Sequence, residues 1–262
     1  DFLPLPLGPL PPSAAKYCQK YMTKHKINQF YEKKYDAKSE DFWKSIELPN
    51  RADQEYVCIG VKASNYFMPT DTLSEKGPGG GGWILMDQSL AVTTRSGERW
   101  SVFGDYPRVF AVGDCNYGCV ETPGKSPDEW AVPPIPKISY PGEEEAVVAV
   151  TNIEKIDALF YEKRTQHHCG SKIEIAGMHW PWGAGMFATS LGPHDACFVI
   201  AANWRKGSGY KVLQGQLSAV QKEVIEASKI NECRNGVIGR LIWHFVHHTP
   251  VHLFGGGPFW GY

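Results

Sequence analysis

Apolar side chains recur at helical spacing in four segments of the chain, and each segment is predicted to form a helix. In the first segment, Ser13 is the expected N-cap residue. In the second, Ala146, Val147, Val150 and Ile153 share one apolar face. The predicted helices span residues 13–26, 142–156, 217–230 and 236–247.

Shorter apolar or alternating runs between these helices predict strands. One pair is expected to form a hairpin, with residues 83–86 and 90–93 on either side of the turn Asp87–Ser89. Single strands are predicted at residues 27–35, 53–60, 108–114, 172–176, 187–191 and 197–203. Helices and strands together place the chain in the α/β class.

The composition predicts a packed protein and argues against a nucleic-acid partner. Apolar residues make up 42% of the 262 residues and aromatic residues 13%, which is enough for a substantial core. Lys and Arg number 27 against 28 Asp and Glu, so the net charge of −1 provides no basic field for nucleic acid. The seven cysteines are odd in number and lack C-x-x-C spacing, which favours reduced thiols over a disulfide framework or a zinc site.

Two motifs that suggest ligand sites are expected to be structural. Gly77, Gly79 and Gly82 match the pattern G-x-G-x-x-G, but a polar loop precedes them and a strand follows. A dinucleotide fingerprint needs a strand before it and a helix after it. A histidine cluster lacks a glutamate or a third ligand at metal-site spacing, so it is expected at a surface or interface and no metal site is predicted. It comprises His244, His247, His248 and His252.

The strand predicted at residues 108–114 ends in Gly113 and Asp114, and this pair is the most informative indication of a ligand site in the sequence. A carboxylate at the carboxyl end of a buried strand lies where open α/β sheets bind ligands. It suits a ribose or ribitol hydroxyl, and the N-terminus of the following helix suits an electron-rich ring edge. Taken alone, Gly-Asp is also a common turn signal.

Several segments together resemble known flavoproteins. The most specific are Val109-Phe-Ala-Val-Gly-Asp-Cys115, Pro136-Lys-Ile-Ser-Tyr140 and Ala146-Val-Val-Ala-Val-Thr-Asn-Ile153. They resemble the second flavin-binding signature of the pyridine-nucleotide:disulfide-oxidoreductase fold. The resemblance is to apoptosis-inducing-factor-like and ferroptosis-suppressor-like proteins, which are kin to type II NADH dehydrogenases. Supporting matches come from residues 56–65, 82–92 and 190–195.

The resemblance implies a partial FAD/NAD(P)-binding, Rossmann-like fold followed by a C-terminal α+β portion. In these terms, residues 1–13 are a Pro-rich arm, 14–76 a remnant of the NAD-binding domain and 77–160 the second part of the FAD-binding domain. Residues 161–253 form the C-terminal domain and 254–262 an aromatic tail. If FAD is bound, the family pattern assigns it to Gly113, Asp114, Lys137 and Tyr140, and it places no catalytic residue in this chain.

Three departures from the family pattern favour a non-catalytic role. The chain begins after both glycine-rich fingerprints of the family, so no cofactor is expected in this chain alone, and FAD only if the missing half is present. The second predicted helix starts Tyr140-Pro-Gly-Glu-Glu-Glu145, where the proline removes an N–H and three carboxylates oppose a reduced flavin. Residues 115–136 form a longer link than a simple connection, which is typical of a protein contact.

Two functions stay open. The favoured one is an accessory or scaffold subunit, derived from an FAD/NAD(P)H oxidoreductase, in a larger membrane-associated, energy-transducing complex of photosynthesis or respiration. The alternative is an FAD-dependent NAD(P)H:quinone-type oxidoreductase whose N-terminal half lies outside this chain.

The sequence also predicts where partners bind. Other protein subunits are expected at the Pro-rich arm, the loop 115–136 and the aromatic tail, and peripheral membrane contact at residues 236–247. No signal peptide is expected, because the start of the sequence lacks a charged region followed by a short apolar one. No spanning helix is expected, because no run of 18 apolar residues is present. The expected location is intracellular, at the membranes of a plastid or mitochondrion.

Overall fold

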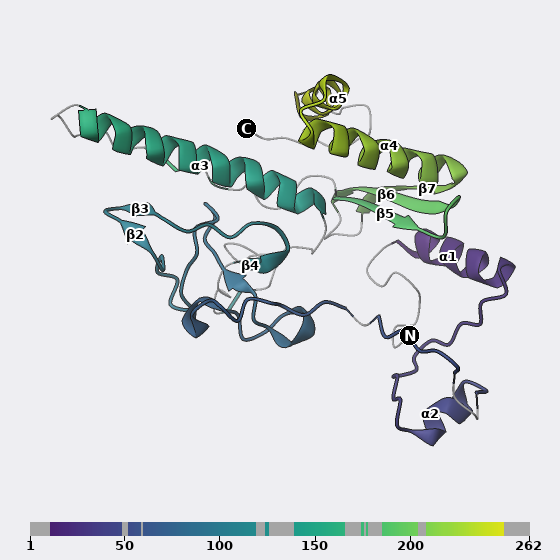
Figure 1. The fold of residues 1–262 in the computed structure, drawn as a ribbon. Coiled ribbons are helices and arrows are strands. Elements are labelled where there is room, and N and C mark those ends of the chain that lie inside the picture. The colour runs from purple at the N-terminus through teal and green to yellow at the C-terminus, as the bar shows by residue number, and fades with distance from the viewer. Residues whose placement is uncertain are drawn as a thin grey trace. The chain divides into compact units, whose positions relative to one another are not determined.

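A computed structural model describes residues 11–48, 52–58, 60–118, 124–125, 139–165, 174–175, 177, 185–203 and 208–248 (Figure 1). The structure is 42% helical and 17% strand, and the strands form small sheets. The chain is therefore α/β in general terms, and no Rossmann fold is confirmed. The chain divides into two compact units, residues 1–56 with 182–262 and residues 57–181. The first unit joins the two ends of the chain, because the N-terminal helix packs on the C-terminal sheet.

The first unit is a three-stranded antiparallel sheet with helices on both faces. Strands β5, β6 and β7 lie in that order, with α4 over one face and α1 over the other (Figure 1). Cys197 and Val199 of β6 pack with Ala14 and Cys18 of α1. The elements are α1 (Pro12–Lys24), α2 (Glu40–Ser45), β5 (Gly185–Ser190), β6 (Ala196–Asn203), β7 (Ser208–Gly215), α4 (Gln216–Cys233) and α5 (Val237–His248).

Two tyrosines fix α1 to the turn between β5 and β6. The hydroxyl of Tyr17 donates to both carboxylate oxygens of Asp195, at 2.9 and 3.0 Å. Tyr21 lies beside Gly192, which has φ +116°, so any side chain added there would be strained and would collide with the Tyr21 hydroxyl. Burial, followed by the hydrogen bond to Asp195, raises the pKa of Tyr17 to about 12.

Two buried cysteines lie in the core of this unit. Cys18 and Cys197 are both 1% exposed. Burial, with a smaller contribution from Cys197, raises the pKa of the Cys18 thiol to about 11, so it is protonated at neutral pH and a poor nucleophile. The cysteines in the described part of the chain are all free: Cys18, Cys58, Cys115, Cys197 and Cys233.

The second unit combines one long helix with short strands and turns. Strands β1 and β4 pair in parallel, and β2 and β3 pair antiparallel. Its core contains Trp83, Leu85 and Tyr117 in one cluster, and Ile84 and Val92 in another. The elements are η1 (Thr70–Thr72), η2 (Pro78–Gly80), β1 (Ile84–Leu85), β2 (Val102–Phe103), β3 (Tyr106–Pro107), η3 (Gly113–Cys115), β4 (Asn116–Gly118) and α3 (Ser139–Thr165).

Some of the predicted helices and strands are present in the structure and others are not. The helices at 13–26, 217–230 and 236–247 and the strands at 187–191 and 197–203 are confirmed, with small shifts. The hairpin at 83–93 is confirmed as an antiparallel bridge between Met86 and Val92 around the predicted turn. Ser13 does not cap α1; the N-cap is Pro11, and a proline follows in the first turn, where no N–H is needed.

Two predicted strands are wrong. Residues 27–35 form no strand, because Lys26 and Glu32 adopt positive φ and interrupt an extended path. The described residues of 53–60 are also irregular, and Tyr56 and Val57 are 79% and 54% exposed rather than buried. Most of the strand predicted at 172–176 lies outside the described residues. Strand β7 was not predicted, because polar residues such as Lys211 and Gln214 alternate poorly there.

The apolar face predicted for the second helix is exposed in α3. Ala146 is exposed, and Val147, Val150 and Ile153 are 41%, 52% and 42% exposed. The buried face is the opposite one and contains two polar side chains. It consists of Glu145, Val148, Ala149, Asn152, Ile156 and Leu159.

We expect Tyr17→Phe to lower the free energy of unfolding by about 1.5 kcal/mol at neutral pH, since it removes a hydrogen bond to a carboxylate. The raised pKa of Tyr17 means that the native state holds this proton more tightly than the unfolded state. Its stabilisation is therefore complete below pH 10 and lost as the pH rises from about 10 to 12. Urea unfolding should show that the free energy of unfolding of Tyr17→Phe falls less than that of the wild-type chain between pH 10 and 12.

Tyr66→Phe is the matched control, because Tyr66 is 91% exposed. It should change the free energy of unfolding by less than about 0.5 kcal/mol. Equal stability and equal pH dependence of Tyr17→Phe and the wild-type chain would contradict the role given to the Tyr17 hydroxyl.

Candidate functional site

The Gly113–Asp114 pair lies in a short turn rather than at the end of a regular strand. The residues before it pair with the hairpin: Val92 N–H donates to Val109 O at 3.0 Å, and Ala111 N–H donates to Leu90 O at 3.0 Å. The strand predicted at 108–114 is therefore reduced to isolated pairing, followed by η3. Gly113 has φ +74°, a conformation that favours glycine.

The first turn of α3 comes close to this turn. A Cβ atom on Gly142 would lie 3.1 Å from Gly113 Cα, so the two glycines together permit the approach. Helix α3 begins at Ser139, three residues before the predicted start at residue 142. Pro141 therefore lies in the first turn, where its missing N–H breaks no helical hydrogen bond.

Glu145 ties α3 to the Gly113 turn from inside the unit. Its side chain is fully buried, and Oε2 accepts hydrogen bonds from Gly113 N–H at 2.5 Å and from Asn116 Nδ2 at 2.6 Å. Asn116 Nδ2 also donates to Ala111 O at 3.3 Å. The carboxylate expected to oppose a reduced flavin is therefore an internal hydrogen-bond acceptor.

The other predicted site residues are only partly brought together. Asp114 is exposed, and no hydrogen-bond partner of its carboxylate is found among the described residues. Tyr140 lies in the first turn of α3, and Lys137 lies outside the described residues, as does most of the loop 115–136. The structure thus joins the Gly113 turn to the start of α3 and leaves one carboxylate, Asp114, facing solvent beside them.

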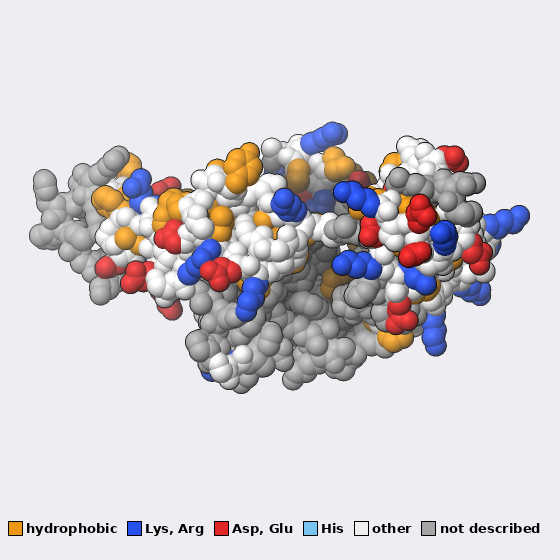
Figure 2. All heavy atoms as spheres, turned by 90° about the horizontal axis from the view of Figure 1, so that it is seen from below, with side chains coloured by type: hydrophobic (Ala, Val, Ile, Leu, Met, Phe, Trp, Pro, Cys, Tyr) orange, Lys and Arg blue, Asp and Glu red, His pale blue; other side chains and the backbone are white. Residues whose placement is uncertain are grey.

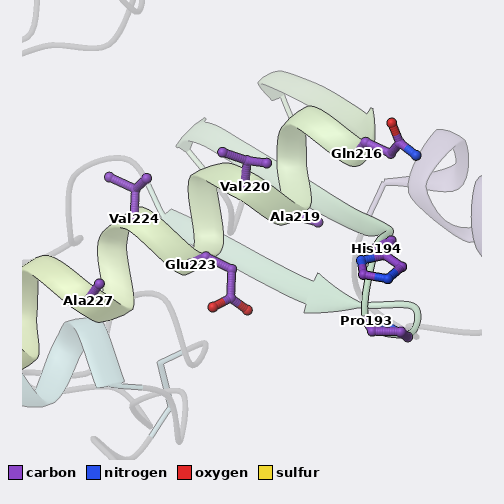
Figure 3. Close-up of a pocket in the computed structure, with 8 residues that line it drawn as sticks. All are labelled: Pro193, His194, Gln216, Ala219, Val220, Glu223, Val224 and Ala227. Atoms are coloured by element: carbon purple, nitrogen blue, oxygen red, sulfur yellow. The ribbon is translucent and has the colours of Figure 1, made fainter.

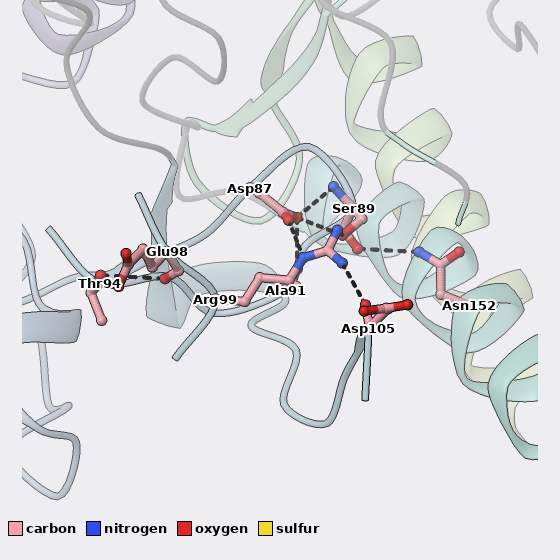
Figure 4. Close-up of polar contacts among 8 residues, drawn as sticks. All are labelled: Asp87, Ser89, Ala91, Thr94, Glu98, Arg99, Asp105 and Asn152. Atoms are coloured by element: carbon pink, nitrogen blue, oxygen red, sulfur yellow. Dashed lines mark hydrogen bonds and ion pairs between the residues drawn. The ribbon is translucent and has the colours of Figure 1, made fainter. Parts of the chain in front are cut away.

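A polar network fixes the hairpin against α3 (Figure 4). Asp87 Oδ1 accepts from the N–H and the hydroxyl of Ser89, at 2.8 and 2.5 Å, and Asp87 Oδ2 accepts from Arg99 Nε at 2.8 Å. Asn152, fully buried on α3, donates from Nδ2 to Ser89 O at 3.2 Å. Each group is used to hold the fold, so this network offers support rather than chemistry.

Asn116 and Asn152 organise this region, and neither was predicted to have a role. The pattern that could have indicated Asn152 is its spacing: Glu145 and Asn152 are seven residues apart and so share a helix face with Val148 and Ala149. A buried polar side chain on an apolar face must find a hydrogen-bond partner, and that partner is a property of the tertiary structure.

The glycine run at 77–82 forms no dinucleotide site in the structure. The element after it is strand β1 rather than a helix, as predicted. The indole of Trp83 donates from Nε1 to Pro78 O at 2.8 Å, and Gly82 N–H donates to Ser74 O at 2.8 Å. These bonds make the run a structural turn.

The described residues contain no group of three or more His, Cys, Asp and Glu side chains placed to bind a metal ion. The side chains of the histidine cluster at 244–252 lie outside the described residues. In the described part of the chain, no helix has both the length and the apolar content that crossing a bilayer requires.

We expect Glu145→Ala to lower the free energy of unfolding by about 3 kcal/mol, because it leaves the buried donors of Gly113 and Asn116 without this acceptor. Glu145→Gln should cost less than half as much, because its amide oxygen can still accept. Urea unfolding measures both, with Glu154→Ala, an exposed carboxylate on the same helix, as a control within about 0.5 kcal/mol of wild type. Similar losses for Glu145→Ala and Glu154→Ala would rule out the proposed tie.

Comparisons with models of protein families, with curated proteins and with solved structures found no match to this chain. The resemblance of its motifs to flavoproteins therefore stays a prediction, and no family assignment follows.

Proposed function

We propose that this chain is a non-catalytic accessory or scaffold subunit that docks onto other polypeptides. In line with the motif resemblance, we place it in a membrane-associated, energy-transducing complex and derive it from an FAD/NAD(P)H oxidoreductase. The observation that carries the proposal is the apolar outer face of α3. Its side chains are accessible although α3 is otherwise well packed against its own unit.

The outer face of α3 has the composition of a contact surface. Val147 and Val150 lie three residues apart on it, and Tyr161, further along the same face, is 71% exposed. Glu154 and Asp157 are exposed on the same face between Val150 and Tyr161, so apolar and acidic side chains alternate along it. Such a face fits a partner segment that offers apolar side chains interspersed with Lys or Arg.

A second exposed apolar feature lies in the same unit and is held rigidly. Tyr66 and Phe67 are 91% and 71% exposed and form an edge-to-face pair with ring centroids 6.4 Å apart. The neighbouring Asn65 is buried and donates from Nδ2 to Gly82 O at 3.0 Å and to Cys115 O at 2.8 Å. Aromatic side chains presented on a fixed turn are typical anchors of protein interfaces.

The surface charge agrees with a protein partner rather than nucleic acid. On the face drawn in Figure 2, Lys and Arg side chains are interspersed with Asp and Glu among the described residues, and neither sign forms a continuous field. Nucleic-acid binding depends on a concentrated basic surface. The overall charge of −1 points the same way.

Glu145 argues against a flavin at this turn. A cofactor phosphate or a reduced ring needs free N–H donors and a positive helix end. Here the chain's own carboxylate already takes the Gly113 N–H and lies within the second turn of α3. The Gly113 N–H is therefore already used by Glu145 and does not serve a cofactor.

One observation favours the alternative, an FAD-dependent NAD(P)H:quinone-type oxidoreductase completed by polypeptide outside this chain. Asp114 is exposed next to the Gly113 turn, with α3 beginning close by, and so has the placement expected of a ribitol-binding carboxylate. Asp114 would then bind FAD, which would supply the redox chemistry, while Glu145 and Asn116 would position the turn that carries Asp114.

The purified chain tests the accessory proposal. We expect it to be colourless, to bind no added FAD in a titration followed by flavin fluorescence, and to leave NADH unoxidised. Stoichiometric flavin absorbance would overturn the accessory proposal. In that case Asp114→Ala should weaken flavin binding by about 1.5 to 3 kcal/mol, the scale of a hydrogen bond to a charged group.

The docking surface is tested by Val150→Glu, which places a charge on the apolar face of α3. When the variant replaces the native chain in cells, we expect its share in a high-mass complex, measured by native electrophoresis of membrane extracts, to fall at least about tenfold. Glu98→Gln, an exposed change elsewhere in the same unit, should assemble like wild type. Migration of the wild-type chain only at its own mass would refute the scaffold role.

A further inference from the structure

Helices α4 and α5 expose apolar side chains on the first unit. We call this surface the step; it consists of Leu217, Val220 and Val224 on α4 and of Val237, Ile238, Leu241 and Ile242 on α5. On α4, Leu217, Val220 and Val224 are 80%, 57% and 55% exposed. Figure 3 shows Val220 and Val224 projecting from the same side of α4, next to a hollow lined by α4 and the turn at Pro193 and His194. This hollow has a volume of about 520 Å³.

Helix α5 forms the raised edge of this step. Its outward side chains are apolar and mostly solvent-accessible, at 63%, 70%, 64% and 39% exposure for Val237, Ile238, Leu241 and Ile242. These residues follow the spacing i, i+1, i+4, i+5, which places them on one helix face. Leaving four such side chains in water on one helix is costly unless a partner covers them.

The step is rigid, because α5 is firmly attached to α4. Trp243 is buried and donates from Nε1 to Ser228 Oγ at 3.1 Å, and Lys229 Nζ lies 3.6 Å from the centroid of its ring. Gly239 N–H donates to Asn231 Oδ1 at 2.8 Å. The outer face of α5 is therefore held in place before any partner binds.

The two helices of the step differ in the sign of their charge. On α4, Glu223 is exposed one turn from Val220, while Glu226 is exposed on the other side of the helix and Lys222 and Lys229 are half-buried. On α5, Arg240 is exposed and no Asp or Glu occurs between residues 237 and 248. Arg234, in the turn before α5, is also exposed.

We propose that this step binds a second copy of the chain, with α5 of each copy lying on the free part of α4 of the other. A two-fold contact of this kind brings each patch against its complement twice, so one surface satisfies both copies. The apolar face of α5 covers Leu217, Val220 and Val224, and Arg240 faces Glu223 of the partner copy. Opposite charges at the two sides of an apolar centre fix the antiparallel register.

This inference goes beyond the proposed function, which concerns other polypeptides and the outer face of α3. It is tested on the purified chain alone, so its outcome is independent of flavin content and of assembly in cells. Failure of either proposal leaves the other measurable.

Sedimentation velocity over a range of concentrations should show a reversible monomer–dimer equilibrium. Leu241→Glu should raise the dimer dissociation constant by about 30-fold or more, since it buries a carboxylate at the centre of the contact. Circular dichroism checks that the variant is folded, which is expected because Leu241 is 64% exposed. Val150→Glu on α3 is the control and should dimerise like wild type.

Charge reversal tests the register. Arg240→Glu and Glu223→Arg should each weaken the dimer about tenfold, and the double variant should return to within about threefold of wild type. A wild-type chain that is monomeric at every concentration overturns the proposal. So does a dimer that is indifferent to Leu241→Glu, or a monomer that floats with phosphatidylcholine–phosphatidylserine vesicles and loses this binding in Leu241→Glu.

Discussion

The second unit depends on one buried carboxylate. Glu145 Oε2 accepts hydrogen bonds from the backbone of Gly113 and from the side chain of Asn116, and so fixes the long helix α3 to the turn before β4. Burying a polar group is costly unless its hydrogen bonds are made, so the helix has one favourable position along this surface. Asn152 secures the next part of the same face through Ser89 O. The valines of the opposite face are left accessible as a direct result.

That arrangement links the stability of the unit to the surface that it exposes. A turn whose Gly113 N–H serves an internal carboxylate contributes less to anion binding, while the exposed face of α3 is the contact area of the scaffold role that we propose. The first unit shows the same division of roles with different chemistry. Tyr17 and Asp195 close the fold over a separation of 178 residues, and the rigid α4–α5 pair presents apolar side chains to the outside. Both units are thus stabilised by polar contacts within and carry apolar surfaces outside.

Local sequence patterns predicted much of the first unit and less of the second. The helices and the strands at 187–191 and 197–203 were found because each carries a strong apolar periodicity or run. The strands at 27–35 and 53–60 failed because positive φ at Lys26 and Glu32, and exposure at Tyr56, are set by surroundings that apolar spacing does not encode. For the candidate site, the Gly113–Asp114 turn and the following helix were anticipated, but the roles of Glu145 and Asn116 were not.

The sequence by itself determined that the chain has an adequate core, balanced charge and amphipathic helices, because these follow from composition and from spacing along one segment. Only the tertiary structure decided which face of α3 is buried. Periodicity marked the apolar face with Val147 and Val150, yet the hydrogen-bond needs of Glu145 and Asn152 outweighed it, since their donors and acceptors come from segments as far as 63 residues away. A helix can be read locally, but the partner of a buried polar group exists only once distant segments have met.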